Sequence, residues 1–223
     1  IKKLTGKAVG AFSLIEEGDR IAVAVSGGKD SYALLHVLEQ LRRRAPIRYE
    51  LVAVNVDAGF PGYRKDILES YLKDCGFNVH MESTNCSHII DEKLRGDSSY
   101  CAFCARLRRG VLYSVADRIG CNKVALGHHL DDFIETLLLN QFYSGSLAAM
   151  SPNLLADNKR HRVIRPLVYV EESSVIKFSE QNEFPIIDCG CPVMGKVDQK
   201  RQRMQQLLAE LQKDNKYLKS SMI

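Results

Sequence analysis

Two cysteines three residues apart, Cys101 and Cys104, have the type and spacing to do chemistry. A Cys-x-x-Cys pair can form a redox disulfide, supply half of a zinc site, or bind an iron–sulfur cluster. The pair alone does not decide among the three. A second close pair, Cys189 and Cys191, lies in the segment DCGCPV. Four thiols are therefore available for one site.

The segment SGGKDS, residues 26–31, follows the apolar run IAVAV and opens an amphipathic stretch, a pattern of strand, glycine loop and helix. Its glycines let backbone N–H groups approach an oxyanion, and the helix start favours negative charge. Ser26 and Ser31 add hydroxyl donors. Lys29 can reach a phosphate, and Asp30 can hold Mg²⁺. The segment matches neither the Walker A pattern nor the dinucleotide-binding pattern, so it predicts another kind of phosphate loop; the alternative is a tight capped turn.

Predicted strands and helices alternate along the chain, and the strands are continuously apolar. This pattern favours an α/β fold, a parallel sheet with helices on both faces. The predicted strands span residues 21–25, 49–59, 78–83, 123–127 and 162–167, with a short extended piece at 185–188. The predicted helices span about residues 1–15, 31–44, 64–76, 104–120, 128–143, 171–182 and 197–216. A polar, turn-rich stretch at 145–162 is either an active-site loop or a surface connection.

The composition is that of a globular protein, with 223 residues, 45% hydrophobic and 26% charged. No apolar run is long enough to span a membrane and there is no secretory signal, so we expect a cytoplasmic protein. Seven cysteines in such a chain favour metal binding or catalysis over a disulfide framework. We interpret Cys75, Cys86 and Cys121 as small buried hydrophobic residues.

The net charge of +4 is compatible with a nucleic-acid partner but does not prove one. The arginine run 42–44 and the group Arg106, Arg108 and Arg109 could pair with RNA phosphates or stack on bases. The alternative for each is a solvated helix face. Arg108 or Arg109 could instead serve the cysteine site or the phosphate loop.

The loop at 26–31 and the later segment GHHLDD, residues 127–132, together resemble the two motifs of the PP-loop family, the N-type ATP pyrophosphatases. The resemblance implies a Rossmann-like, adenine nucleotide alpha-hydrolase-like fold, ATP and Mg²⁺ as cofactors, and adenylation of a carbonyl oxygen with release of pyrophosphate. It assigns nucleotide binding to Ser26, Gly27, Gly28, Lys29, Asp30, Ser31, Val54, Asn55, Val56, Gly127 and His128. It assigns catalysis or metal binding to Lys29, Asp30 and Asp132. The alternative for Asp131 and Asp132 is an exposed first turn of a helix.

Within the PP-loop family, the chain resembles the tRNA 2-thiolation family, and most closely its tRNA 2-thiocytidine synthetases. The stretches that carry this resemblance are EEGDRIAVAVSGGKDSY, LVAVNVD, CARLRRGVLY, ALGHHLDD, IRPL and FPII followed by a cysteine. In that family three cysteines bind a [4Fe–4S] cluster and leave one iron without a protein ligand. The resemblance assigns Cys101, Cys104 and Cys191 as the ligands. Cys189 is the alternative third ligand, because this chain has Cys-x-Cys where the family has Cys-x-x-Cys. A zinc site formed by all four cysteines is the main rival, ahead of a redox disulfide and of unliganded thiols.

The position of the first cysteine pair fits a site for an anionic group. Spacing of three residues puts Cys101 and Cys104 on one face of a helical turn. We expect the helix start and the following Arg106, Arg108 and Arg109 to lower the pKa values of these thiols and to stabilise a cluster.

The function implied by the resemblance is that of an ATP-dependent tRNA-cytidine sulfurtransferase. O2 of a cytidine, expected to be cytidine 32 of the anticodon loop, attacks the α-phosphate of ATP, and sulfide carried on the open iron then displaces AMP. The implied partners are tRNA, a sulfur donor supplying persulfide or sulfide from a cysteine desulfurase, and a second copy in a homodimer. The alternatives are a 2-thiouridine synthetase, a lysidine synthetase or related ligase, and a non-catalytic ATP- and tRNA-binding or redox-sensing module. The expected organisation is an amphipathic helix at 1–18, a PP-loop domain with the cluster site at 19–195, and a terminal helix at 196–223.

Overall fold

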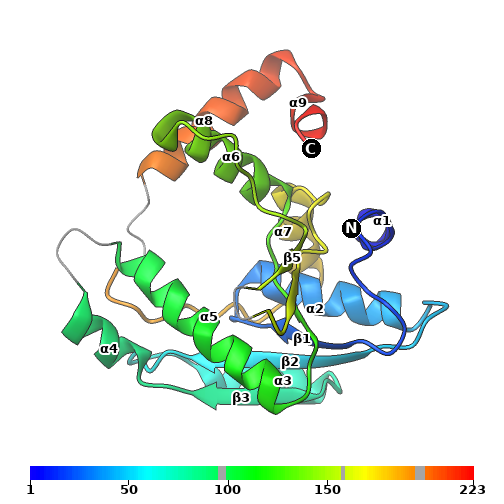
Figure 1. The fold of residues 1–223 in the computed structure, drawn as a ribbon, viewed down its shortest axis with the longest axis vertical. Coiled ribbons are helices and arrows are strands. Elements are labelled where there is room, and N and C mark those ends of the chain that lie inside the picture. The colour runs from blue at the N-terminus through cyan, green and yellow to red at the C-terminus, as the bar shows by residue number, and fades with distance from the viewer. Residues whose placement is uncertain (95–98, 157–158, 194–198) are drawn as a thin grey trace.

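The computed structural model describes residues 1–94, 99–156, 159–193 and 199–223. Its strands form one sheet in the order β3-β2-β1-β4-β6-β5 (Figure 1). They are β1 (Arg20–Ala24), β2 (Glu50–Asp57), β3 (Val79–Ser83), β4 (Lys123–Ala125), β5 (Asn153–Leu155) and β6 (Arg162–Ile164). All neighbouring strands are parallel except β5, which pairs antiparallel with β6. The predicted α/β class is therefore confirmed, with one antiparallel strand at the edge.

Helices cover both faces of the sheet. They are α1 (Lys2–Ala11), α2 (Lys29–Arg42), α3 (Lys65–Asp74), α4 (Cys86–Lys93), α5 (Tyr100–Arg118), α6 (Leu130–Ser144), α7 (Glu172–Gln181), α8 (Gln199–Asp214) and α9 (Leu218–Ser221). α1, α2, α3 and α7 contribute to the core on one face, and α5 packs on the other. Figure 1 shows α6, α8 and α9 as an upper layer that rises away from the sheet, and these helices share an apolar cluster of their own.

The apolar strands follow from this arrangement. Along β1, Ile21 and Val23 pack in the core beneath α2, whereas Ala22 packs beneath α5, and all three are fully buried. Because alternate side chains of a strand point to opposite faces, a central strand covered on both faces must be apolar throughout. Within the described part of the chain, no helix is both long and apolar enough to cross a membrane.

Some elements differ from the sequence prediction. The stretch 145–162 contains β5, a short edge strand with largely exposed side chains, so its sequence has no apolar signal. The short helices α4 and α9 are additional, and the piece at 185–188 forms no strand. Cys86 and Cys121 are buried as predicted, but the prediction for Cys75 is wrong, since this residue caps α3 and is exposed. The predicted helix residues 197–198 and the predicted boundary at 195–196 lie outside the described residues.

A buried lysine joins the amino ends of the two central strands. Lys123, at the start of β4, is 2% exposed, and its Nζ lies 2.7 Å from an Asp19 carboxylate oxygen and 2.8 Å from Glu16 Oε2. The other Asp19 oxygen accepts a hydrogen bond from Asn122 Nδ2 at 2.7 Å. A buried charge is stable only when it is paired and hydrogen-bonded. This network therefore fixes β4 beside β1, and with it the relative position of the loops at their carboxyl ends.

Replacing this lysine tests the network. Lys123→Ala leaves the Asp19 carboxylate buried without its cation, and we expect the free energy of unfolding to fall by about 3 kcal/mol. Lys73→Ala is the matched control, because Lys73 pairs with Glu69 on the surface of α3; it should cost about 0.5 kcal/mol or less. Urea unfolding of the two variants measures the difference. Equal stability losses would contradict a structural role for the buried lysine.

Candidate active site

The glycine loop (residues 26–31) and the GHHLDD segment (residues 127–132) meet at one edge of the sheet. The first follows β1 and the second follows β4, and these strands are parallel neighbours. The chain leaves β1 for β2 on one side of it and reaches β4 on the other. In open α/β sheets ligands bind where the strand order reverses in this way. The fold therefore brings both predicted motifs to the expected binding position.

Internal hydrogen bonds shape the glycine loop. The Ser31 hydroxyl donates to the Gly28 carbonyl oxygen at 2.8 Å and accepts from the Ser26 backbone N–H at 3.2 Å. Gly27 has a φ of +90°, which favours glycine, and its carbonyl accepts a hydrogen bond of 2.9 Å from Ile187 N–H. The loop thus turns sharply into α2 and is held from outside by the segment that precedes the distal cysteines.

Gly127 lies directly against the start of α2. A Cβ atom at this position would lie 3.0 Å from the Asp30 carbonyl oxygen and 3.3 Å from the Ser31 backbone nitrogen. Contacts this short require the neighbouring backbone to move. Glycine is therefore needed here for the two motifs to approach each other, independently of any ligand.

The two motifs line a cavity of about 440 Å³, the loop cavity. Its lining residues are Ala24, Val25, Ser26, Gly28, Asp30, Ser31, Val54, Val56, Ala105, Arg108, Arg109, Leu112, Leu126, Gly127, His128, Asp132 and Arg201. Most residues assigned to nucleotide binding from the sequence are among them. The predicted residues Gly27, Lys29 and Asn55 are not.

Asn55 is turned away from the loop cavity. It lies on β2 between Val54 and Val56, so the strand alternation points its side chain to the other face of the sheet. There Asn55 Nδ2 donates to the Val25 carbonyl at 2.7 Å and to the Tyr63 hydroxyl at 2.6 Å. The Tyr63 hydroxyl in turn donates to the Ser26 carbonyl at 3.2 Å. The structure thus gives Asn55 a supporting contact behind the loop, in place of the predicted contact with adenine.

Lys29 is engaged by a glutamate that the sequence analysis missed. Its Nζ lies 2.9 Å from Glu172 Oε1, at the start of α7, and 3.2 Å from the Asp30 carboxylate. Burial lowers the pKa of Lys29, but the hydrogen bond to Glu172 and the charge of Asp30 outweigh it, so the pKa is raised. Lys29 is therefore a cation beside the loop cavity, although its side chain does not line it.

Asp131 and Asp132 have different partners. Asp132 lines the loop cavity, accepts a hydrogen bond of 3.0 Å from His129 N–H and pairs with Arg201 at 2.7 Å. Asp131 accepts a hydrogen bond of 2.7 Å from Glu172 N–H and pairs with Lys219 at 2.6 Å. Burial raises the pKa of Asp131, but the bonds from Lys219 and the Glu172 backbone prevail and lower it. Neither carboxylate forms the exposed helical turn weighed as an alternative: Asp131 joins α6 to α7 and α9, and Asp132 faces the cavity.

Two arginines from distant parts of the chain act at the loop cavity: Arg201 lines it, and Arg165 contacts His128, which lines it. Arg201, on α8, reaches the cavity from the upper layer, and no local pattern in the sequence indicates this. Arg165 lies in the IRPL stretch, which the resemblance includes without giving it a role; its Nε donates to His128 Nδ1 at 3.2 Å. By contrast, the arginine run 42–44 lies at the opposite end of α2, where Arg42 and Arg43 pair with Glu39. This pairing favours the solvated-face interpretation of the run.

His128 is held in its neutral form. Burial and the charge of Arg165 lower the pKa of His128 to about 4. The hydrogen bond from Arg165 occupies Nδ1 as an acceptor, so the proton of the neutral ring is on Nε2. His128 therefore offers the loop cavity an uncharged N–H donor.

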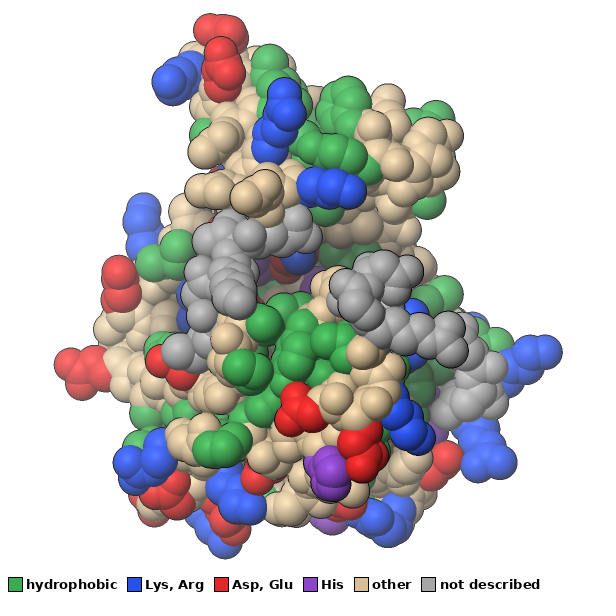
Figure 2. Space-filling model, turned by 90° about the vertical axis from the view of Figure 1, so that its left-hand side faces the viewer, with side chains coloured by type: hydrophobic (Ala, Val, Ile, Leu, Met, Phe, Trp, Pro, Cys, Tyr) green, Lys and Arg blue, Asp and Glu red, His purple; other side chains and the backbone are tan. Residues whose placement is uncertain are grey.

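All four candidate cysteine ligands line a second cavity of about 280 Å³, the cysteine cavity. Its lining residues are Ser26, Gly28, Val56, Ala58, Phe60, Tyr63, Tyr100, Cys101, Cys104, Ala105, Arg108, Ile187, Cys189 and Cys191. Figure 2 faces this side of the molecule and shows apolar side chains gathered below the upper layer, with charged groups around them. Cys101 and Cys104 lie in the first turns of α5, whose start is capped by the Ser99 hydroxyl.

Gly190 shapes the distal cysteine pair. It has a φ of +67°, and a Cβ atom here would lie 2.8 Å from the Pro61 carbonyl oxygen. The turn brings Cys189 Sγ and Cys191 Sγ to 3.1 Å from each other. The Cys-x-Cys spacing therefore places both sulfurs at the same cavity, and Cys189 and Cys191 both stay candidates for the third ligand.

The prediction that the thiol pKa values are lowered is wrong for Cys104. Burial raises the pKa of Cys104, and the nearby charge of Arg108 offsets this only in part. Burial and the hydrogen bond with Cys189 also raise the pKa of Cys191. A metal or cluster must therefore displace the protons of Cys104 and Cys191 on binding.

The cysteine cavity brings four thiols to one apolar space. Among the described residues, no three His, Cys, Asp or Glu side chains converge closely enough to hold a single metal ion. A structural zinc ion needs four ligands at about 2.3 Å. Four thiols around an apolar cavity, next to a helix start, instead suit a soft, anionic metal–sulfur cluster.

The two cavities share a wall. The residues that line both are Ser26, Gly28, Val56, Ala105 and Arg108. The first two belong to the glycine loop, and the last two belong to α5, one and four residues after Cys104. A group bound in one cavity is therefore separated from a group in the other by no more than these side chains and backbone atoms.

Comparisons with known proteins agree with this geometry. The sequence model of the PP-loop domain matches residues 2–188. Proteins named tRNA-cytidine(32) 2-sulfurtransferase from Syntrophotalea carbinolica and Geobacter sulfurreducens are 70% and 60% identical over the whole chain, which covers 86% and 87% of their lengths. The solved structure of the U34-tRNA thiolase NcsA from Methanococcus maripaludis with its [4Fe-4S] cluster has a TM-score of 0.78 at 22% identity, covering 99% of this chain and 75% of that one. At that identity the structural likeness shows a shared fold.

The contact between the two motifs predicts the effect of adding one methyl group. Gly127→Ala forces the GHHLDD segment away from α2, and we expect ATP to bind at least tenfold more weakly, as measured by equilibrium dialysis. Gly110→Ala is the matched control, because a Cβ at this position on α5 meets nothing within 4 Å. It should leave ATP binding unchanged. Unchanged binding in Gly127→Ala would show that the close approach of the two motifs is not needed for the nucleotide.

Because the pKa of His128 is lowered, we expect this histidine to make the free energy of unfolding fall as the pH is lowered. Below about pH 6.5 the unfolded chain binds a proton on this histidine, whereas the folded protein binds it only near pH 4. The contribution of His128 to the free energy of unfolding is therefore fully present above pH 6.5. It is lost as the pH falls towards 4, at up to about 1.4 kcal/mol per pH unit. His128→Gln, which keeps an acceptor for Arg165, should have a shallower slope in urea unfolding between pH 6.5 and 5. Identical slopes in the wild type and in His128→Gln would show that folding does not favour the neutral form of His128.

Proposed function

The chain belongs to the PP-loop family and, within it, to the tRNA-cytidine(32) 2-sulfurtransferases, and we propose that it uses ATP to replace O2 of a tRNA cytidine, expected at position 32 of the anticodon loop, with sulfur. The observation that supports this most directly is the wall shared by the loop cavity and the cysteine cavity. A base at this wall can reach an activated phosphate on one side and a sulfur source on the other. Holding reactants in contact supplies much of the rate enhancement of a two-substrate reaction.

The first step takes place at the loop cavity. Cytidine O2 attacks the α-phosphorus of ATP, the bond from that phosphorus to the bridging oxygen breaks, and pyrophosphate leaves. The backbone N–H groups of the glycine loop and the start of α2 hold phosphate oxygens. Arg108 and Arg109 add positive charge beside them, and Asp30 and Asp132 supply carboxylates for Mg²⁺. His128 Nε2–H donates a hydrogen bond to the nucleotide.

The second step takes place at the wall between the cavities. Sulfide attacks C2 of the adenylated cytidine, the C2–O2 bond breaks, and AMP leaves with the oxygen. A [4Fe–4S] cluster held by Cys101, Cys104 and Cys191, with Cys189 as the alternative third ligand, would supply the sulfide from its iron without a protein ligand. Arg108 lies on the shared wall, where its charge stabilises the leaving AMP phosphate.

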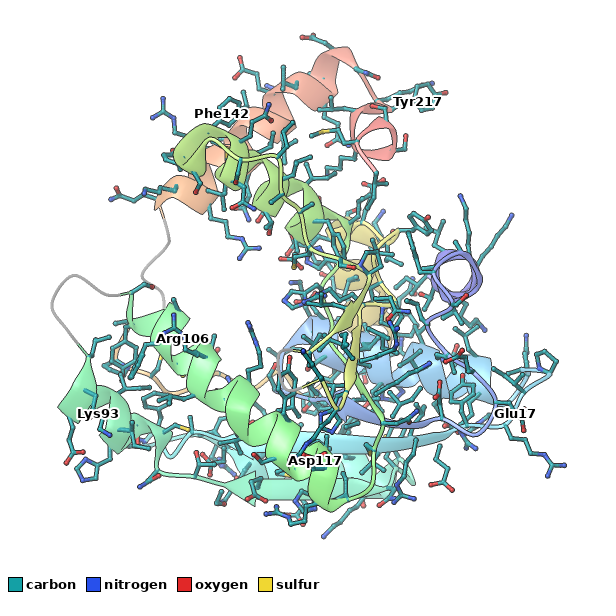
Figure 3. The ribbon with its side chains drawn as sticks, viewed as in Figure 1. Glu17, Lys93, Arg106, Asp117, Phe142 and Tyr217 are labelled. Carbon is teal, nitrogen blue, oxygen red and sulfur yellow. The ribbon has the colours of Figure 1, made fainter. Side chains whose placement is uncertain are left out.

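The tRNA would approach over exposed side chains of α5 and of the upper layer. Arg106 and Arg109 on α5 are exposed, and Phe142 on α6 is 59% exposed. Figure 3 shows Arg106 on α5 and Phe142 on the upper layer, the two layers that contribute residues to the loop cavity. Arginine can bind phosphates and an exposed aromatic ring can stack on a base, which suits an anticodon loop whose bases are accessible. The sulfur reaches the site from a persulfide or sulfide donor.

Two rival functions make different measurable claims. A 2-thiouridine synthetase would leave cytidine unmodified, so mass spectrometry of the nucleosides identifies the product directly. A nucleotide-binding module with a zinc site formed by the four cysteines would hold zinc, contain no sulfide and release no pyrophosphate.

The proposed function predicts that the two cavities can be disabled separately. Protein purified without oxygen should contain about four iron and four sulfide per chain, and should release pyrophosphate and form 2-thiocytidine only when tRNA is present. Asp30→Ala should lose pyrophosphate release but keep its iron and sulfide. Cys104→Ala should lose the cluster but still bind ATP. Cys75→Ala, which changes an exposed thiol outside both cavities, is the control and should keep both properties.

Three results would contradict the proposal. Zinc in place of iron and sulfide would make the cysteines structural. Normal pyrophosphate release by Asp30→Ala would remove the role of Asp30 at the loop cavity. Full iron and sulfide content in Cys104→Ala would overturn its assignment as a ligand.

A further inference from the structure

Tyr100 has a buried hydroxyl group without a hydrogen-bond partner. It is the first residue of α5 and directly precedes Cys101. In the described part of the chain its hydroxyl oxygen is inaccessible to solvent, and no donor or acceptor lies within bonding distance. Buried hydroxyl groups are nearly always paired, so a group without a partner indicates one that is supplied by something else.

Tyr100 lies between the cysteine cavity and a small pocket that holds Asp91, but its hydroxyl is not hydrogen-bonded to Asp91, so the cysteines are the other acceptors it faces. Its ring lines the cysteine cavity and packs in an apolar cluster that also includes Phe60, Cys104 and Cys191. The rings of Tyr100 and Phe60 are tilted, with centroids 6.2 Å apart. The phenylalanine cannot accept a hydrogen bond from the hydroxyl, whereas the cysteines can do so once their sulfurs are ionised.

The hydroxyl remains a donor at neutral pH. An ordinary tyrosine keeps its phenolic proton up to about pH 10. A protonated thiol is a weak acceptor, but a metal-bound thiolate is a strong one. The partner that the hydroxyl lacks in the metal-free protein is therefore created when the cysteines bind metal.

We propose that the Tyr100 hydroxyl donates a hydrogen bond to the metal-bound sulfur of Cys104 or Cys191 and so raises the reduction potential of the cluster. Tyr100 is a positioning residue: it acts through a ligand and does not touch the substrate. A hydrogen bond to a cluster sulfur withdraws negative charge and favours the reduced form. This inference rests on the proposed function, because it assumes a cluster in the cysteine cavity.

Tyr100→Phe tests the hydrogen bond because it removes only the hydroxyl oxygen. The wild type and the variant are purified without oxygen, their iron and sulfide are measured, and the cluster is titrated with mediators while its visible absorption is followed. We expect the equilibrium constant for one-electron reduction to fall about tenfold in the variant, which is a shift of about 59 mV to lower potential. Tyr217→Phe is the control, since Tyr217 is 64% exposed on the upper layer, and its potential should equal that of the wild type.

The outcomes separate this inference from the function on which it rests. A cluster with the same potential in wild type and Tyr100→Phe overturns the hydrogen bond and leaves the proposed function intact. A wild-type protein without iron and sulfide overturns both. A metal-free Tyr100→Phe protein that is less stable than the metal-free wild type would show that the hydroxyl already has a partner without metal, which also contradicts the inference.

Discussion

The whole site depends on contact between stretches of backbone that leave no room for a side chain. A Cβ atom on Gly127 would lie 3.0 Å from the backbone carbonyl oxygen of Asp30, and a Cβ atom on Gly27 would lie 3.0 Å from the side-chain Cβ of Ile187 and 3.5 Å from its carbonyl oxygen. Such contacts bring the ends of β1 and β4 and the segment before the distal cysteines together around one point. Close packing of this kind tolerates little expansion, because a side chain added there must displace a neighbouring backbone. The side chains proposed to take part in the reaction lie around this meeting point of the three segments.

The same contacts connect the two cavities mechanically. The Tyr32 hydroxyl donates to the Pro185 carbonyl at 3.1 Å, and Ile187 N–H donates to Gly27 at 2.9 Å. The segment that ends in Cys189 and Cys191 is therefore held by α2 and by the glycine loop. The connection between the glycine loop and the distal cysteines therefore runs through hydrogen bonds to the backbone of a single segment.

The sequence was informative where a function depends on consecutive residues. The glycine loop, the GHHLDD segment and the Cys-x-x-Cys pair each combine a local conformation with local chemistry, and the alternation of strands and helices places them at one edge. Glu172 and Arg201 were missed because their roles come from tertiary contacts, with Lys29 and with Asp132, that no periodicity encodes. The contacts of the Asn55 side chain with Val25 and Tyr63 were not foreseen, because a motif position gives no side-chain direction until the strand register is known.

The charges at the loop cavity give a physical reason for selectivity. Lys29 pairs with Glu172 and Arg201 pairs with Asp132, so charges that could serve a nucleotide also have partners within the protein. An anion alone would break these pairs and leave carboxylates unpaired beside it, which is unfavourable in a partly buried site. Under the proposed function, magnesium and ATP together would bring both signs of charge, so that each freed carboxylate and each freed cation would find a partner. The ion pairs would then favour the metal–nucleotide complex over phosphate or free ATP.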